Sequence, residues 1–135
     1  MANALFVPFK NVQLGSGTPV TFPTDAIKVI LVDGADYTVN LSTHDFLNDL
    51  AAVGRVATAT LATKTVAGGA FDSADPTFTA VSGDVSELLV LYKDTGTEAT
   101  SNLIAYYDTF SAGMPITPNG GNIVCTVASA GWFAL

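Results

Sequence analysis

Charged side chains are scarce in this sequence. Asp, Glu, Lys and Arg make up 13% of the 135 residues, whereas about 25% is usual in globular proteins. The five cationic residues are scattered singly along the chain, while nucleic-acid binding relies on clustered Lys and Arg. The net charge of −7 also opposes contact with anionic lipid surfaces. The sequence therefore predicts no nucleic-acid partner and no membrane partner.

Cysteine and long apolar runs are also nearly absent. Cys125 is the single cysteine, so an intrachain disulfide is impossible, and we expect a buried structural thiol in the stretch "NIVCTV". The first ten residues, "MANALFVPFK", lack the basic leader of a signal peptide. No stretch reaches the roughly 18 apolar residues of a membrane span. These features predict synthesis and folding in a reducing cytoplasm.

Groups suited to catalysis are few. His44 is the only histidine, and a nucleophilic triad needs a Ser or Cys beside it with a carboxylate behind. Asp45 is its neighbour, yet adjacent residues on a helix point in different directions. No G-x-S-x-G motif accompanies it, and "GSGT" at 15–18 lacks the Gly-Lys of a phosphate-binding loop. We predict no enzyme activity, no catalytic residue and no cofactor.

The carboxylates show no metal-binding spacing. "DGAD" places Asp33 and Asp36 close together, but a calcium loop needs several alternating oxygen ligands and a late Glu, which are missing. Asp33 is explained more simply by a turn at the end of a strand. Asp72, Asp75 and Asp84 lie near predicted turns and are expected to be solvated. We predict no metal ligands, with a surface cation site in a β loop as the alternative.

The sequence consists mainly of short apolar runs separated by Gly, Pro, Asn and Ser. This pattern is typical of β-strands joined by turns. About eight strands are predicted, over residues 4–9, 26–33, 55–68, 70–81, 86–94, 101–110, 121–127 and 131–135. We expect an all-β fold, an antiparallel β-sandwich of jelly-roll-like or immunoglobulin-like topology. It would form a single domain over residues 1–135, in which 1–25 form an N-terminal strand or arm and a loop. Periodicity leaves the strand order open.

One short helix is predicted at 41–54, "LSTHDFLNDLAAVG". Ser42 or Thr43 is suited to cap its N-terminus and Gly54 to end it. Phe46, Leu47 and Leu50 would then share the face that packs against the sheet.

The apolar segments at the two ends are the candidate interfaces. Residues 119–135, "NGGNIVCTVASAGWFAL", contain no charged side chain. Either these segments complete the core or another molecule covers them. The candidate interface residues are Leu5, Phe6, Val7, Phe9, Trp132, Phe133 and Leu135.

Several stretches resemble small virion structural proteins of tailed bacteriophages. They are "IKVILVDGADYTVNLSTHDFLND" (27–49), "VSGDVSELLVLYKDTGTEATSNLIAYYD" (81–108) and "PITPNGGNIVCTVASAGWFAL" (115–135). Within them, "ILVDGADY", "HDFL", "LVLYKDTG" and "PITPNGG" carry the resemblance, which extends from about residue 26 to 135. Members of this group are described as structural, fibre-like or head decoration proteins.

The resemblance implies a non-enzymatic decoration, or cement, protein. Such a protein would be made in the host bacterial cytoplasm and located on the outer capsid surface of the virion. Its partners would be the major capsid protein, whose capsomers it bridges, and further copies of itself in a dimer or trimer. A tail, baseplate or fibre-associated structural protein is the first alternative. A carbohydrate-binding module is the second, and it would need an exposed aromatic platform or a carboxylate pair in a cleft.

Overall fold

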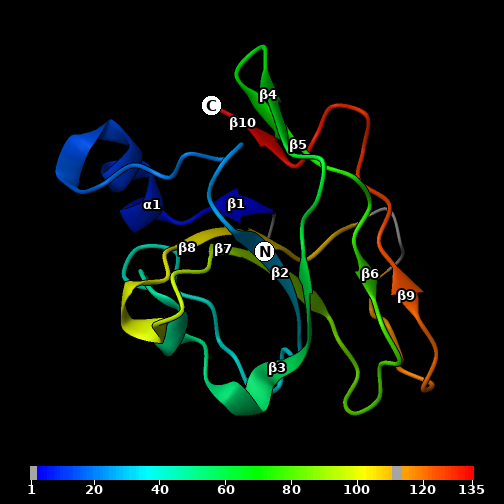
Figure 1. Cartoon of the computed structure of the whole chain (residues 1–135). Coiled ribbons are helices and arrows are strands. Elements are labelled where there is room, and N and C mark those ends of the chain that lie inside the picture. Colours follow the sequence, from blue (N-terminus) through cyan, green and yellow to red (C-terminus); the bar gives the residue numbers. More distant parts are fainter. Residues whose placement is uncertain (1–2, 111–113) are drawn as a thin grey trace.

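The longest apolar strands pair at the centre of the molecule. The computed structural model describes residues 3–110 and 114–135. Five strands form an antiparallel sheet in the order β1-β8-β7-β2-β3 (Figure 1). These strands are β1 (Ala4–Leu5), β2 (Ile27–Val32), β3 (Arg55–Thr60), β7 (Leu88–Lys93) and β8 (Leu103–Tyr107).

The near-continuous apolar runs of β2, β7 and β8 explain why they occupy the middle of this sheet. Every residue of β8 is buried, as are all of β7 except Lys93 and all of β2 except Lys28. Val90 lies opposite Ile30 on one side and Tyr106 on the other. A strand that is covered on both faces favours such a run over alternation. The predicted strands at 86–94 and 101–110 are therefore confirmed as β7 and β8, which pair antiparallel.

Two smaller antiparallel sheets surround the central one. The first has the order β10-β5-β4 and the second pairs β6 with β9 (Figure 1). The all-β antiparallel prediction is confirmed, and the described residues form ten strands in three sheets instead of about eight. The jelly-roll-like or immunoglobulin-like sandwich topology stays a prediction. The strands are β4 (Thr65–Ala67), β5 (Ala70–Asp72), β6 (Thr77–Phe78), β9 (Ile123–Val124) and β10 (Phe133–Ala134).

One cluster of buried side chains joins the three sheets. It unites central-sheet residues such as Leu89 and Leu91 with Phe71 of β5, Phe78 of β6 and Trp132 before β10. Burial of apolar surface of this kind is the main source of stability in a chain with few charges. The small sheets are therefore held mainly by side chains, because their own ladders are only two or three residues long.

The prediction of a helix at 41–54 is wrong, because this segment does not form an α-helix. This segment contains two short 3₁₀ turns, η2 (Leu47–Asp49) and η3 (Ala52–Gly54), and Phe46 before them is extended. Phe46 forms a β-bridge with Asn102, and Leu47 N–H donates to the carbonyl of Ser101. Because these long-range bonds occupy the backbone groups that a helix would use, the periodic pattern does not become a helix.

The short helix lies instead where an edge strand was predicted. Of residues 4–9, only Ala4 and Leu5 belong to β1, and α1 (Val7–Asn11) begins directly afterwards. Pro8 lies in its first turn, where the missing N–H is not needed and the fixed φ suits a helix. One wide turn, η1 (Val12–Ser16), follows α1.

Candidate functional site

An apolar cleft opens between the segment after α1 and the β4–β5 hairpin. Its volume is about 320 Å³, near the lower end of the range for binding pockets. The C-terminal residues and this hairpin lie at the same end of the molecule (Figure 1). None of the lining side chains is charged. The lining residues are Gln13, Val20, Thr21, Phe22, Pro23, Val66, Gly69, Ala70, Phe71, Phe133 and Leu135.

Packed aromatic rings form the floor of the cleft. The ring centroid of Phe22 lies 4.5 Å from that of Phe71 and 5.4 Å from that of Phe133. Phe9 of α1 adds an edge contact to Phe22 at 5.9 Å. Aromatic packing of this kind is directional and holds each ring in place. The floor is therefore preformed, as expected of a binding surface.

The margin of the cleft exposes large apolar side chains. Val66 of β4 is 54% exposed and Leu135 is 71% exposed. Leu14, which follows the lining residue Gln13, is 88% exposed. Gln13 is fixed by two hydrogen bonds between its side-chain amide and the backbone of Val20. Exposed apolar residues next to an apolar cleft mark this end of the molecule as a candidate interaction surface.

The predicted interface residues divide between the core and the surface. Phe6 and Phe9 are 0% and 1% exposed, and Trp132 is 5% exposed. Phe6 N–H donates to the carbonyl of Ile104 in β8, so this segment belongs to its own sheet. Leu5 and Phe133 are half-buried against the core. Only Val7, at 39%, and Leu135 expose much apolar surface.

Trp132 connects the C-terminal segment to the rest of the fold. Its indole Nε1–H donates to Ser73 Oγ at 2.8 Å, and its carbonyl accepts a hydrogen bond from Tyr107 Oη at 2.7 Å. The ring stacks on Phe110 at a centroid distance of 5.3 Å. An aromatic side chain with its polar atom satisfied inside the protein contributes to the core. Of the two alternatives stated for this segment, completion of the core therefore describes Trp132, which is one of the candidate interface residues.

Exposed aromatic platforms are absent from the described residues, which include every aromatic side chain of the chain. All of these residues are buried or half-buried. Stacking on a sugar needs an accessible ring face, so the described surface lacks one of the two features by which the carbohydrate-binding alternative was defined, the exposed aromatic platform.

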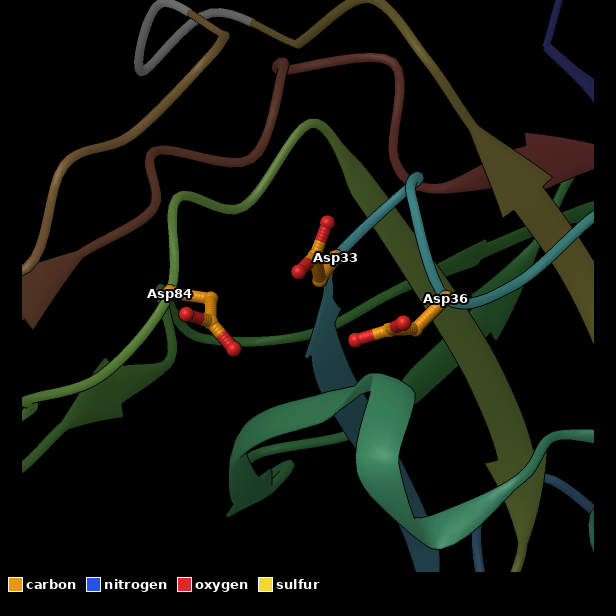
Figure 2. Close-up of side chains that lie close together, drawn as sticks. All are labelled: Asp33, Asp36 and Asp84. Carbon is orange, nitrogen blue, oxygen red and sulfur yellow. The ribbon is translucent and has the colours of Figure 1, made fainter.

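Three carboxylates converge at one end of the central sheet. Asp33, Asp36 and Asp84 have carboxylate oxygens within 4.8 Å of one another (Figure 2). Asp33 follows β2 and is 8% exposed, and its Oδ1 accepts a hydrogen bond from Ala35 N–H. Carboxylate oxygens suit hard cations such as Ca²⁺, but Ca²⁺ takes about six to eight oxygen ligands. The cluster supplies three carboxylates and concentrates negative charge.

Sequence reasoning considered Asp33 and Asp36 together in "DGAD", but it assigned Asp84 separately to a solvated turn. The antiparallel pairing of β2 with β7 is what brings them together, because Val32 at the end of β2 lies opposite Leu88 at the start of β7. The turn after β2 therefore lies beside the loop before β7, which carries Asp84. The pairing of the two longest apolar runs is the signal that could have identified this cluster.

His44 contacts groups that orient it without activating a nucleophile. Its Nδ1 lies 2.8 Å from Tyr37 Oη and 3.3 Å from the backbone nitrogen of Asn40. Burial raises the pKa of Tyr37 well above its usual value, so the phenol keeps its proton. Because Asn40 N–H donates to Nδ1, this ring nitrogen is an acceptor, and Tyr37 Oη can donate to it. No Ser or Cys hydroxyl or thiol in the described part of the chain hydrogen-bonds to this imidazole.

A carboxylate pair lies beside this histidine. Asp45 N–H donates to Asp49 Oδ2 at 2.9 Å. Burial raises the pKa of Asp45, and its hydrogen bond to Asp49 raises it further. Burial acts in the same direction on Asp49, but the hydrogen bonds from Asp45 outweigh it and lower the pKa of Asp49. Both groups serve to fold the turn at 45–49 instead of lining a cleft.

Cys125 is the remaining reactive group. Its side chain is 0% exposed, and burial raises the pKa of the thiol to about 11. The thiol is therefore protonated and inaccessible at neutral pH, and the prediction of a buried thiol is confirmed.

No helix in residues 3–110 and 114–135 is both long enough and apolar enough to cross a membrane. No protein-family model matches the chain, and no curated protein matches it.

Proposed function

We propose that this protein is a non-enzymatic structural component of a tailed-phage particle. It binds the outer capsid surface as a decoration protein and stabilises the shell by bridging capsomers of the major capsid protein. The observation that carries the proposal is the resemblance of 27–49, 81–108 and 115–135 to virion structural proteins. These ranges contain the central strands β2, β7 and β8 and the C-terminal strands β9 and β10.

The charge distribution supports a position outside the shell. A net charge of −7 repels packaged DNA and disfavours an internal site. The cleft and its margin offer an uncharged apolar surface, which is easily desolvated against another protein. Many weak contacts on a repeating lattice then add up to stable attachment.

The arrangement of chemical groups supports binding over catalysis. His44 is held by Tyr37 and Asn40, and the thiol of Cys125 is buried. The buried aromatic rings also favour a protein-binding role over the carbohydrate-binding alternative.

Capsid binding by the purified protein tests this proposal. Capsids assembled without the decoration protein are mixed with increasing amounts of the folded chain and separated by density-gradient sedimentation. We expect saturable co-sedimentation at a stoichiometry near that of the capsid protein, together with a higher capsid melting temperature. Absence of binding to capsids would overturn the proposal, and binding to isolated tails instead would favour the tail or baseplate alternative.

A further inference from the structure

We propose that Asn119 is a site of spontaneous deamidation, and that the turn around it controls the rate. The backbone nitrogen of Gly120 loses its proton and attacks the side-chain amide carbon of Asn119. The new C–N bond closes a succinimide ring as the C–N bond of the side-chain amide breaks and ammonia leaves. Water then opens the ring and leaves an aspartate or isoaspartate residue in place of Asn119. This inference is independent of the proposed function.

The sequence makes Asn119 different from every other asparagine of the chain. It is the only one that is followed by glycine. The ring closes on the nitrogen of the next residue, and a side chain on that residue would hinder the approach of the carboxamide. The other asparagines are followed by Ala, Val, Leu, Asp or Ile. Ring closure is therefore least hindered at Asn119.

The surroundings of Gly120 leave room for the reaction. Asn119 and Gly120 are both exposed, so water reaches the site and ammonia can leave it. Gly120 adopts a φ of +86°, a conformation that glycine reaches without steric cost. No atom outside its immediate chain neighbours lies within 4 Å of the position that a Cβ would occupy. The side chain of Asn119 therefore has free access to this nitrogen.

A hydrogen bond polarises the carbonyl group that is attacked. Gly121 N–H donates to Asn119 Oδ1 at 2.9 Å. Attack on the amide carbon moves negative charge onto this oxygen in the tetrahedral intermediate. A backbone donor that already points at the oxygen stabilises that charge, as the donors of an oxyanion hole do. The turn therefore supplies the electrostatic help that the first step needs.

A second hydrogen bond protects the attacking nitrogen. Gly120 N–H donates to the carbonyl of Val81 at 2.7 Å, and Val81 N–H donates to the carbonyl of Gly121 at 2.9 Å. Gly120 must release the first of these bonds before it can attack. The contact continues the β6–β9 pairing, in which each strand has only two residues. Short, exposed pairings of this kind open at a low free-energy cost, so local opening sets the rate.

The reaction would change both the charge and the geometry of this segment. Residues 119–135 contain no charged side chain, and deamidation adds one carboxylate to them. Isoaspartate also lengthens the main chain by one methylene group, which displaces Gly121 from its bond to Val81. An aged molecule would therefore differ from a new one at the turn that precedes β9.

Peptide mass spectrometry of the full-length chain tests the site. After incubation at mildly alkaline pH and physiological temperature, we expect the mass change of an amide-to-acid conversion at Asn119. Asn122 is the internal control. It is exposed, and its Oδ1 accepts a hydrogen bond from Ala80 N–H at 2.9 Å, but Ile123 follows it. Asn122 should remain an amide, and Asn119→Gln should remove the conversion, because its longer side chain closes a ring more slowly.

Two further measurements test the control by the turn. Conversion at Asn119 should be at least roughly tenfold faster in the urea-unfolded chain than in the folded chain. Asn122→Ala removes the acceptor of Ala80 N–H, which precedes Val81. This variant should therefore accelerate both deamidation at Asn119 and hydrogen–deuterium exchange at the Gly120 amide. Circular dichroism confirms that it is folded.

Three outcomes would overturn the inference. The first is an unchanged Asn119 in the folded chain over a period in which the unfolded chain converts completely. The second is equal conversion at Asn122, which would remove the special role of Gly120. The third is an equal rate at Asn119 in the folded and unfolded chains, which would show that the bond to Val81 does not control the reaction.

Discussion

The central sheet and the β10-β5-β4 sheet use similar residues in different ways. In the central sheet, β7 and β8 are buried along nearly their whole length and present no surface to a partner. In the smaller sheet, all three residues of β4 are exposed, while Phe71 of the adjacent β5 is buried. The comparison teaches that the buried core and the candidate interaction surface lie in different sheets. The small sheet can expose apolar side chains such as Val66 because these side chains are not needed to bury the central sheet.

Trp132 is the residue that joins the two regions, and its loss should have the largest effect. Trp132→Ala removes a buried ring and leaves a cavity, so we expect a loss of about 3–5 kcal/mol in the free energy of unfolding. Urea denaturation measures it. Trp132→Phe keeps most of the ring contacts but loses the bond to Ser73, and a cost of about 1 kcal/mol is expected. A loss below about 1 kcal/mol for Trp132→Ala would contradict this role.

Matched substitutions in the two sheets sharpen the comparison. Leu91→Ala in β7 empties a site that is 0% exposed, and should cost about 2–5 kcal/mol. Val66→Ala in β4 removes a side chain that is 54% exposed, and should change stability by less than about 0.5 kcal/mol in the monomer. Denaturation at low protein concentration checks both values. Equal losses in the free energy of unfolding would contradict the distinction between a buried central sheet and an exposed small sheet.

Arg55 tests how the turn at 47–50 is attached to the central sheet. Its guanidinium donates to the carbonyls of Leu47 and Leu50 and also pairs with Glu98. Arg55→Ala leaves those carbonyls without this donor, so we expect a loss of about 1–3 kcal/mol. Glu98→Gln is the control, because it removes the ion pair alone at an exposed site, and its effect in the same denaturation assay should be much smaller. An equal effect would assign the stability to the ion pair.

The Lys28–Asp94 pair at the start of β2 should produce a smaller, pH-dependent effect. Lys28 Nζ lies 2.8 Å from Asp94 Oδ2, and this hydrogen bond lowers the pKa of Asp94. Its contribution is therefore present above the unfolded pKa of about 3.9 and is lost as pH falls through the lower folded value. Asp94→Asn should be slightly less stable than wild type at pH 7 and equally stable near about pH 2. Thermal denaturation at both values checks this, and a difference that grows on acidification would contradict the sign.

The smallest effect is expected at the carboxylate cluster. Asp84→Asn removes one of three like charges within 4.8 Å and should raise stability by about 0.5 kcal/mol at low ionic strength. About 1 M salt should reduce the gain, because screening weakens the repulsion between the exposed carboxylates of Asp36 and Asp84. Thermal denaturation at the two ionic strengths measures the difference. A loss of stability at low salt would mean that the carboxylate makes a favourable contact instead.

The difference between the central sheet and the rest of the fold also explains which elements could be predicted from the sequence. β2, β7 and β8 have near-continuous apolar runs that indicate strands on local information alone. The segment 41–54 matches a helical period over two turns, and only partners distant in sequence, Ser101 and Asn102, draw its backbone away from that helix. Pro8 suits both an edge strand and a helix start, so residues 4–9 were ambiguous.

The candidate site was less predictable than the fold. Leu14 is a single apolar residue in a Gly- and Ser-containing segment, which gives no periodic signal. The cleft combines residues near 13–23, 66–71 and 133–135, which only the tertiary fold brings together. The buried state of Trp132 and the exposed state of Leu135 also differ within four residues, because the bonds to Ser73 and Tyr107 hold only the first of them inside.

The central claim, a decoration protein on the capsid surface, is tested most directly by the number of copies in a purified virion. Quantitative mass spectrometry against the major capsid protein provides this number. The account predicts a copy number comparable with that of the capsid protein. A handful of copies per particle, or absence from the particle, would contradict it.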